Sequence, residues 1–245
     1  MTQQDRAAFF VEAPFALGAQ VSLSESDAQH VAVLRLGLRE RVGLRDGAGH
    51  TASGALVRLG RKNALVEIDD VDHVAPPAPI HLLVPVADRD RMLWLAEKAA
   101  ELNVASWRPV LWQRSRSVSP RGDGPTFRNK VRSRMISALL QSRSAWLPEI
   151  FPEATPERAI AASPAGSRVV LESSGSPFSS IAVGAPIVIA VGPEGGFESE
   201  ELVELQAAGF TTASIGRSVL RFETAALAGV AVARAMLDSA MTQER

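Results

Sequence analysis

The chain has 245 residues, of which 46% are hydrophobic, and its formal net charge is −1. This length allows one large or two modest domains with a sizeable core, and the absence of cysteine excludes disulfides and thiolate metal sites. No apolar run approaches the roughly eighteen residues that a membrane span needs, and residues 1–8 are polar and charged. We therefore expect a cytoplasmic protein with neither a membrane nor a metal as partner.

The small net charge hides a strong segregation of charge. Residues 108–143 hold nine basic residues, eight of them arginine, and a single acid, Asp123. The planar fork of arginine matches phosphate, and a basic stripe is the electrostatic footprint of nucleic-acid binding. The plainer interpretation is a solvated, charged loop and helix face.

Short β-prone stretches and close turns dominate residues 1–75. They predict strands at 9–11, 41–44, 54–59 and 64–71, and a helix over 24–36. This pattern favours a small β-barrel. Pro76, Pro77 and Pro79 then mark a linker, because proline blocks the continuation of a helix or a strand ladder.

Strands and helices alternate from residue 80 onward. Strands are expected at 80–85, 107–112, 168–171, 187–191 and 211–215, and helices at 91–102, 127–142, 156–162, 199–208 and 224–240. Pro109 favours a strand edge or a strand end for its stretch. The alternation predicts an α/β fold with a parallel sheet that is covered by helices.

One glycine-rich turn stands out within this second part. Residues 192–197 (Gly-Pro-Glu-Gly-Gly-Phe) join the apolar stretch 187–191 to an acidic helix start. Ligands of α/β proteins bind at the carboxyl ends of strands, and glycine lets the backbone come close to them. The turn lacks the lysine of a P-loop and the order of a dinucleotide fingerprint. Glu194 would repel a phosphate, which favours a neutral or partly cationic ligand such as adenosylmethionine, whereas the plainer alternative is a turn with nothing bound.

Two C-terminal stretches together resemble a known family. Residues 192–201 and 215–225 are similar to the motifs of the SPOUT methyltransferases, and most of all to those of the ribosomal RNA small subunit methyltransferase E family. Shorter likenesses extend the resemblance over nearly the whole chain, at 9–11, 30–35, 46–47, 98–102, 113–115, 141–143 and 148–149. That family methylates N3 of a uridine in 16S ribosomal RNA, with S-adenosyl-L-methionine as the methyl donor.

The resemblance implies a fold, a set of partners and a set of site residues. It implies a PUA-like RNA-binding β-barrel over 1–75 and a SPOUT domain over 76–245, with a trefoil knot at about 171–235, homodimerisation through the knotted domain, and the small ribosomal subunit as partner. The cofactor would contact ten residues: Leu171, Gly192, Pro193, Glu194, Gly195, Gly196, Ile215, Gly216, Leu220 and Ala225. RNA would contact Arg35, Arg114, Arg116 and Arg132, and catalytic parts would fall to Arg143, Arg221 and Glu223.

Several points stay open in the sequence. Glu194 either favours the sulfonium or caps the helix at Ser199. Residues 216–223 form a second compact loop, which follows the strand expected at 211–215. Arg221 and Glu223 either brace this second loop, as an ion pair, or act on the substrate, and no residue is identified as a general base. Other functions compatible with the sequence are a non-catalytic RNA-binding or ribosome-assembly factor, a SPOUT enzyme acting on another RNA, and a nucleotide-binding enzyme of ordinary doubly wound fold.

Overall fold

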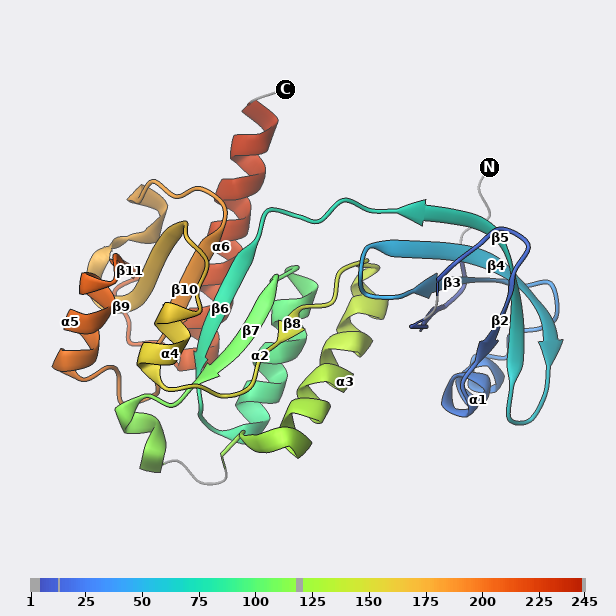
Figure 1. Ribbon diagram of the computed structural model, residues 1–245, viewed down its shortest axis with the longest axis horizontal. Helices are drawn as coiled ribbons and strands as arrows, with labels where there is room; N and C mark the ends of the chain where they lie inside the picture. Colours follow the sequence, from blue (N-terminus) through green and yellow to red (C-terminus); the bar gives the residue numbers. More distant parts are fainter. Residues whose placement is uncertain (1–4, 13, 118–120, 244–245) are drawn as a thin grey trace. The chain divides into compact units, whose positions relative to one another are not determined.

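The computed structural model describes residues 5–12, 14–117 and 121–243, without the side chains of residues 116, 117 and 241–243. The chain divides into two compact units. The first comprises Met1–Pro76 and Leu139–Leu147, and the second comprises Pro77–Ala138 and Pro148–Arg245. Figure 1 shows the elements in chain order.

The first unit is built on a five-stranded sheet with the order β1-β3-β4-β5-β2. Its strands are β1 (Ala8–Phe10), β2 (Gln20–Leu23), β3 (Arg41–Arg45), β4 (His50–Leu59) and β5 (Ala64–His73). The β1–β3 pair is parallel, and the other pairs are antiparallel. Helix α1 (Glu25–Val33) begins after Ser24, whose hydroxyl accepts a hydrogen bond from the backbone of Asp27. A cap of this kind contributes about 1 kcal/mol.

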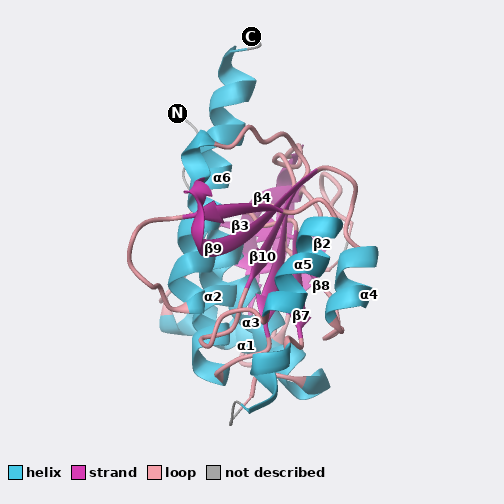
Figure 2. Cartoon of the chain, turned by 90° about the vertical axis from the view of Figure 1, so that its left-hand side faces the viewer, coloured by secondary structure: helices cyan, strands magenta, loops and turns pink. Residues whose placement is uncertain are grey.

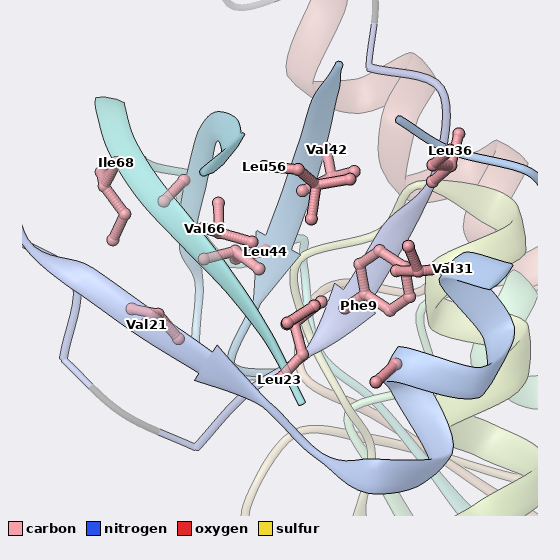
Figure 3. Packing of buried hydrophobic residues seen from close by; sticks show 13 residues of the cluster. Phe9, Val21, Leu23, Val31, Leu36, Val42, Leu44, Leu56, Val66 and Ile68 are labelled. Atoms are coloured by element: carbon pink, nitrogen blue, oxygen red, sulfur yellow. The ribbon is translucent and has the colours of Figure 1, made fainter. Parts of the chain in front are cut away.

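One apolar cluster forms the core of this unit (Figure 3). Phe9 lies between α1 and the strands, beside Val31, and Leu44 and Leu56 complete the centre of the cluster. All four side chains are buried. Buried and more exposed positions alternate along β2 and β4, as expected for strands that bury one face only. The predicted strands and the helix of this part are therefore confirmed, with β4 and β5 longer than expected.

Residues 139–147 join the first unit through backbone hydrogen bonds. Gly49 N–H donates to Ala145 O over 3.0 Å, and Leu147 N–H donates to Gly47 O over 2.9 Å. The indole of Trp146 donates to Val74 O over 3.0 Å. Gly49 has a φ of +93°, and a Cβ there would lie 2.5 Å from the Trp146 ring, so this close approach requires glycine.

The second unit contains a six-stranded sheet with the order β11-β9-β10-β6-β7-β8. Every neighbouring pair in it is parallel. The strands are β6 (Ile80–Pro85), β7 (Ser106–Val110), β8 (Glu149–Ile150), β9 (Ser167–Pro177), β10 (Ile187–Val191) and β11 (Thr211–Ser214). The predicted α/β fold with a parallel sheet is confirmed.

Helices cover both faces of this sheet (Figure 2). They are α2 (Arg89–Glu101), α3 (Gly124–Ser142), α4 (Pro156–Ala161), α5 (Ser199–Ala207) and α6 (Phe222–Gln243). Helices α4 and α5 pack on one face, where Ala159 and Leu205 meet Val188 and Ala190 of β10. Helices α2 and α6 pack against each other on the opposite face. No helix in the described ranges is long and apolar enough to cross a membrane.

Pro109 lies one residue before the end of β7, which confirms the expected strand end, although β7 is not an edge strand because it lies between β6 and β8. Strand β8 pairs only with Ser106 and Trp107 of β7, so the β7–β8 ladder ends before Pro109. One expected helix start needs correction. Helix α6 begins at Phe222 rather than at residue 224, because the Phe222 side chain is buried and anchors the first turn.

His81 of β6 makes the stability of the second unit sensitive to pH. Its Nδ1 lies 2.8 Å from Ser106 Oγ, and burial lowers the pKa of this imidazole below 6.5. The unfolded chain then binds the proton more readily, so stability is lost as the pH falls through 6.5. From about pH 7.5 to about pH 5.5, the free energy of unfolding in urea should fall more for the wild type than for His81→Gln. An equal fall in both proteins would contradict this expectation.

Candidate active site

A pocket opens in the second unit where β10 and β11 end, beside the middle of their neighbour β9. Leu171 of β9, Val191 of β10 and Ala213 of β11 lie in its wall. Leu171 and Val191 are direct partners in the β9–β10 ladder. The cavity has a volume of about 230 Å³. The carboxyl ends of parallel strands are the usual location of ligand sites in open α/β sheets.

All ten residues that were predicted to hold the cofactor line this one pocket. Ser218 and Val219, within the stretch 215–220 that the resemblance also implied, line it too. Sequence reasoning missed six other lining residues: Glu172, Ser173, Val191, Phe197, Ala213 and Phe222. Most of these lie within or close to the two C-terminal motifs, so their place in the sequence could have indicated that they line the pocket. Contact of the ten residues with a cofactor remains a prediction.

The glycine loop between β10 and α5 is held from both ends. A Cβ on Gly192 would lie 2.9 Å from the Phe197 ring, and Gly196 has a φ of +75°, which favours glycine. The buried indole of Trp112 donates a hydrogen bond to Val191 O over 3.1 Å. Its ring also meets the Phe197 ring edge to face, with 4.9 Å between the centroids. The loop therefore presents its backbone to the pocket in a defined shape.

Helix α5 is capped by Glu198 and not by Glu194. The Glu198 and Glu201 side chains form a reciprocal capping box at its first turn. Arg114 donates from Nε and Nη2 to the two Glu198 oxygens, over 2.9 and 3.2 Å, and also donates to Gly195 O. This guanidinium lowers the pKa of the Glu198 carboxyl. The predicted RNA contact Arg114 thus braces the glycine loop, and its role toward RNA remains a prediction.

Arg91 connects the two loops that form the pocket. It lies in the first turn of α2 and makes an ion pair with Glu194 of the glycine loop. Its Nε also lies 3.9 Å from Glu223 Oε1, next to the second loop. The Glu223 side chain is only 12% exposed, and its Oε2 is buried without a hydrogen-bond partner. Within the described ranges no ion pair joins Arg221 to Glu223, so that expected pair is wrong: Arg221 is exposed, and the carboxylate faces Arg91 instead.

Sequence reasoning missed Arg91, although one signal could have indicated it. Strand β6 lies next to β10 in the sheet, and α2 follows β6 after a short turn. The first turn of α2 therefore has to lie at the same end of the sheet as the glycine loop. Without the strand order, nothing in the sequence relates residue 91 to residue 194.

The charge of the pocket restricts its ligand. Two of the described lining residues, Glu172 and Glu194, carry a carboxylate, and none of them carries a basic group. Arg91 balances Glu194 from outside the lining set. A phosphate would find no cation in the wall, whereas a ligand with a positive centre would be attracted. The charge pattern favours a cationic ligand over a nucleotide.

Three other predicted residues with described side chains, Arg35, Arg132 and Arg143, do not line this pocket. Arg35 (φ +54°) follows α1, and Arg143 (φ +59°) follows α3; both belong to the first unit. Arg132 is a half-buried residue of α3. The Arg116 side chain lies outside the part that the structure describes, and only its backbone is placed, in the 3₁₀ turn Gln113–Ser117. The roles assigned to these four arginines remain predictions.

Comparison with known proteins matches the second unit to a family. The sequence model of the RNA methyltransferase domain matches residues 75–234. The chain belongs to this RNA methyltransferase family. Two curated relatives, from Mycobacterium bovis and Mycobacterium tuberculosis, are each named ribosomal RNA small subunit methyltransferase E. Each is 28% identical to this chain over 232 residues, which cover 89% of this chain and 87% of the relative.

Solved structures agree with this family over nearly the whole length. A ribosomal RNA small subunit methyltransferase E from Neisseria gonorrhoeae, bound to S-adenosylmethionine, matches with a TM-score of 0.86 and 27% identity over 94% of this chain and 98% of that one. A Legionella pneumophila protein, also in complex with S-adenosylmethionine, matches with a TM-score of 0.85 and 26% identity over 94% and 97%. The resemblance to the methyltransferase E family is confirmed.

Proposed function

We propose that this chain transfers a methyl group from S-adenosyl-L-methionine to N3 of a uridine in the 16S ribosomal RNA of the small subunit. One observation carries the proposal, and it is made in a member of the RNA methyltransferase family. The pocket is lined by a glycine loop and by two carboxylates, and none of its described lining residues is basic. The relatives that carry the methyltransferase E name support the choice of ribosomal RNA.

The residues of the pocket fit this cofactor. A Cβ would be crowded at Gly192 and strained at Gly196, and glycine avoids both. Because these positions carry no side chains, the backbone of the loop can contact a ligand directly. Glu172 and Glu194 suit a positive sulfonium or ammonium group. Leu220 supplies apolar wall on the second loop. When bound, the cofactor supplies an already activated methyl group, so the main task of the protein is alignment.

The finer features of the fold belong to the same proposal. We infer a PUA-like barrel over residues 1–75 and a SPOUT domain over 76–245 with a trefoil knot at about 171–235, and homodimerisation through the knotted domain. The five-stranded sheet of the first unit and the strand order of the second support this assignment. The similarity to the Neisseria gonorrhoeae enzyme over both units supports it further.

The substrate sets further requirements for the site. Uracil N3 is hidden in a paired helix, so the target base has to be unpaired or flipped out. The proton on N3 has to leave before or during the transfer of the methyl group. We propose that Arg143 binds a phosphate or a uracil oxygen of the substrate. Arg221 and Glu223 support the second loop, and no residue is assigned as the general base.

The Arg143→Ala variant is expected to keep its affinity for S-adenosylmethionine. Its rate of methyl transfer to small ribosomal subunits should fall by about 100-fold, which is the typical effect of removing one hydrogen-bond donor that stabilises a reacting group. Calorimetry measures the first quantity, and transfer of a labelled methyl group measures the second. Arg143→Lys retains the positive charge and serves as the conservative variant. Normal transfer by the alanine variant would remove Arg143 from the site. If the wild type bound no S-adenosylmethionine, a non-catalytic RNA-binding role would be favoured instead.

A further inference from the structure

A second hollow of the second unit lies between α2 and α3. It has a cavity volume of about 840 Å³ and shares no lining residue with the cofactor pocket. Its lining residues are Arg89, Asp90 and Leu93 of α2, and Thr126, Asn129, Lys130, Ser133, Arg134 and Ser137 of α3. We refer to this hollow as the α2–α3 groove.

One face of α3 forms the longer wall of the groove. Its lining positions recur every three to four residues, which places them along a single face of the helix. The Ser133 hydroxyl donates to Asn129 O over 3.0 Å, and the Ser137 hydroxyl donates to Ser133 O over 3.1 Å. Both side chains therefore stay close to their own helix, which leaves the groove open between the longer basic side chains.

The charge of the groove is positive. Arg89, Lys130 and Arg134 line it, against a single lining acid, Asp90. Residues 124–142, which form α3, contain four basic residues and no acid. Arg134 Nη1 lies 3.8 Å from Glu97 Oε2, but the Arg134 side chain is 59% exposed. Exposed pairs of this kind contribute little, so the guanidinium can exchange this carboxylate for a phosphate.

The other lining residues distinguish between possible occupants. Leu93 is the single apolar lining residue among those described, so the groove offers little to a hydrophobic helix or peptide. Lys130 and Arg134 lie four residues apart on α3 and Arg89 lies on α2, with small polar side chains between them. Such a lining suits a chain that carries one negative charge per unit. A nucleic-acid backbone has this charge pattern, and phosphate contacts of this type position a substrate without reading its sequence.

We propose that the α2–α3 groove binds the sugar–phosphate backbone of the RNA substrate through Arg89, Lys130 and Arg134. This inference rests on the proposed function, which supplies the RNA. It adds three residues to the predicted RNA contacts Arg35, Arg114, Arg116 and Arg132. The groove contributes affinity and orientation, whereas the cofactor pocket carries the chemistry.

Salt dependence of RNA binding tests the groove directly. The triple variant Arg89→Gln/Lys130→Gln/Arg134→Gln and the wild type are titrated with deproteinised 16S ribosomal RNA in filter-binding assays over a range of salt concentrations. The logarithm of the binding constant falls with the logarithm of the salt concentration. Loss of three phosphate contacts should make this negative slope shallower by about 2 and weaken binding at low salt by on the order of tenfold or more. Affinity for S-adenosylmethionine should not change, because none of the three residues lines the cofactor pocket.

A second pair of variants separates charge from size. Ser133→Glu places a carboxylate in the groove, and Ser133→Gln adds a side chain of nearly the same size without charge. We expect the glutamate variant to bind the RNA several-fold more weakly than the glutamine variant. Arg158→Gln, which removes an exposed arginine of α4 outside the groove, controls for the general loss of positive charge.

The possible results separate a failure of the groove proposal from a failure of the proposed methyltransferase function. An unchanged slope and affinity in the triple variant, while the protein still binds S-adenosylmethionine and methylates the RNA, would overturn the groove and leave the proposed function standing. Equal RNA affinity of Ser133→Glu and Ser133→Gln would likewise overturn it. Failure of the wild type to bind the RNA would overturn both, and failure to bind S-adenosylmethionine would count against the proposed function alone.

Discussion

Gly196→Val is expected to weaken the binding of S-adenosylmethionine by about 10- to 100-fold. Gly196 has a φ of +75°, a region in which a β-branched residue is strained by about 1–3 kcal/mol. Its N–H donates to Pro193 O over 2.8 Å, so relief of the strain has to distort this turn. The turn forms one wall of the pocket, and calorimetry with S-adenosylmethionine measures the resulting loss of affinity.

Gly18→Val provides a matched control for this substitution. Gly18 has a φ of +76°, and no heavy atom lies within 4 Å of the place where its Cβ would stand. It belongs to the first unit and does not line the pocket. Both variants should lose a similar amount of thermal stability, but only Gly196→Val should lose cofactor affinity. Wild-type affinity in Gly196→Val would show that the glycine loop is not part of the cofactor site.

Arg91→Gln is expected to raise the KM for S-adenosylmethionine by about 10-fold. The substitution removes the cation that contacts both Glu194 and Glu223. The Glu223 side chain is only 12% exposed, and the substitution removes its cationic partner. An uncompensated polar group in such surroundings costs about 1–3 kcal/mol. The carboxylates would then move toward water and take both loops of the pocket with them. Steady-state kinetics and calorimetry measure the effect.

A double-mutant cycle separates this positioning role from a general loss of stability. Arg91→Gln, Glu194→Gln and the double variant should give non-additive losses of cofactor affinity, because the two side chains are in direct contact. Arg91→Lys keeps the charge and should recover part of the affinity. The same residue exchange at Arg158, an exposed position of α4, should leave cofactor affinity at the wild-type value. Strictly additive losses would contradict the assignment of Arg91 as the link between the loops.

The architecture of the second unit could be predicted because its signals are local. A parallel strand that is buried on both faces appears in the sequence as an unbroken apolar run, as in β10, where all five residues are buried. The glycine turn follows this run directly, and its motif is continuous in the chain. The resemblance to the methyltransferase E family rests on two motifs that are each continuous in the chain, and through it ten lining residues of the pocket could be named without a structure.

The remaining site residues depend on which distant segments become neighbours. Arg91 precedes the glycine loop by about one hundred residues, and only the placement of β6 beside β10 brings the two together. The pairing of Glu223 with Arg91 rather than with Arg221 depends on the same packing. The capping box at Glu198 was visible in the spacing of Glu198 and Glu201, but glutamate is not among the preferred N-cap residues.

Mass spectrometry of the RNA product tests the central claim most directly. Purified protein is incubated with S-adenosylmethionine and with small ribosomal subunits from cells that lack this protein, and the 16S ribosomal RNA is then digested to nucleosides and to fragments. We expect N3-methyluridine at one position, only when the cofactor is present, and not with Gly196→Val. Absence of any new methyl group, or a methyl group on a different nucleoside, would contradict the proposed reaction.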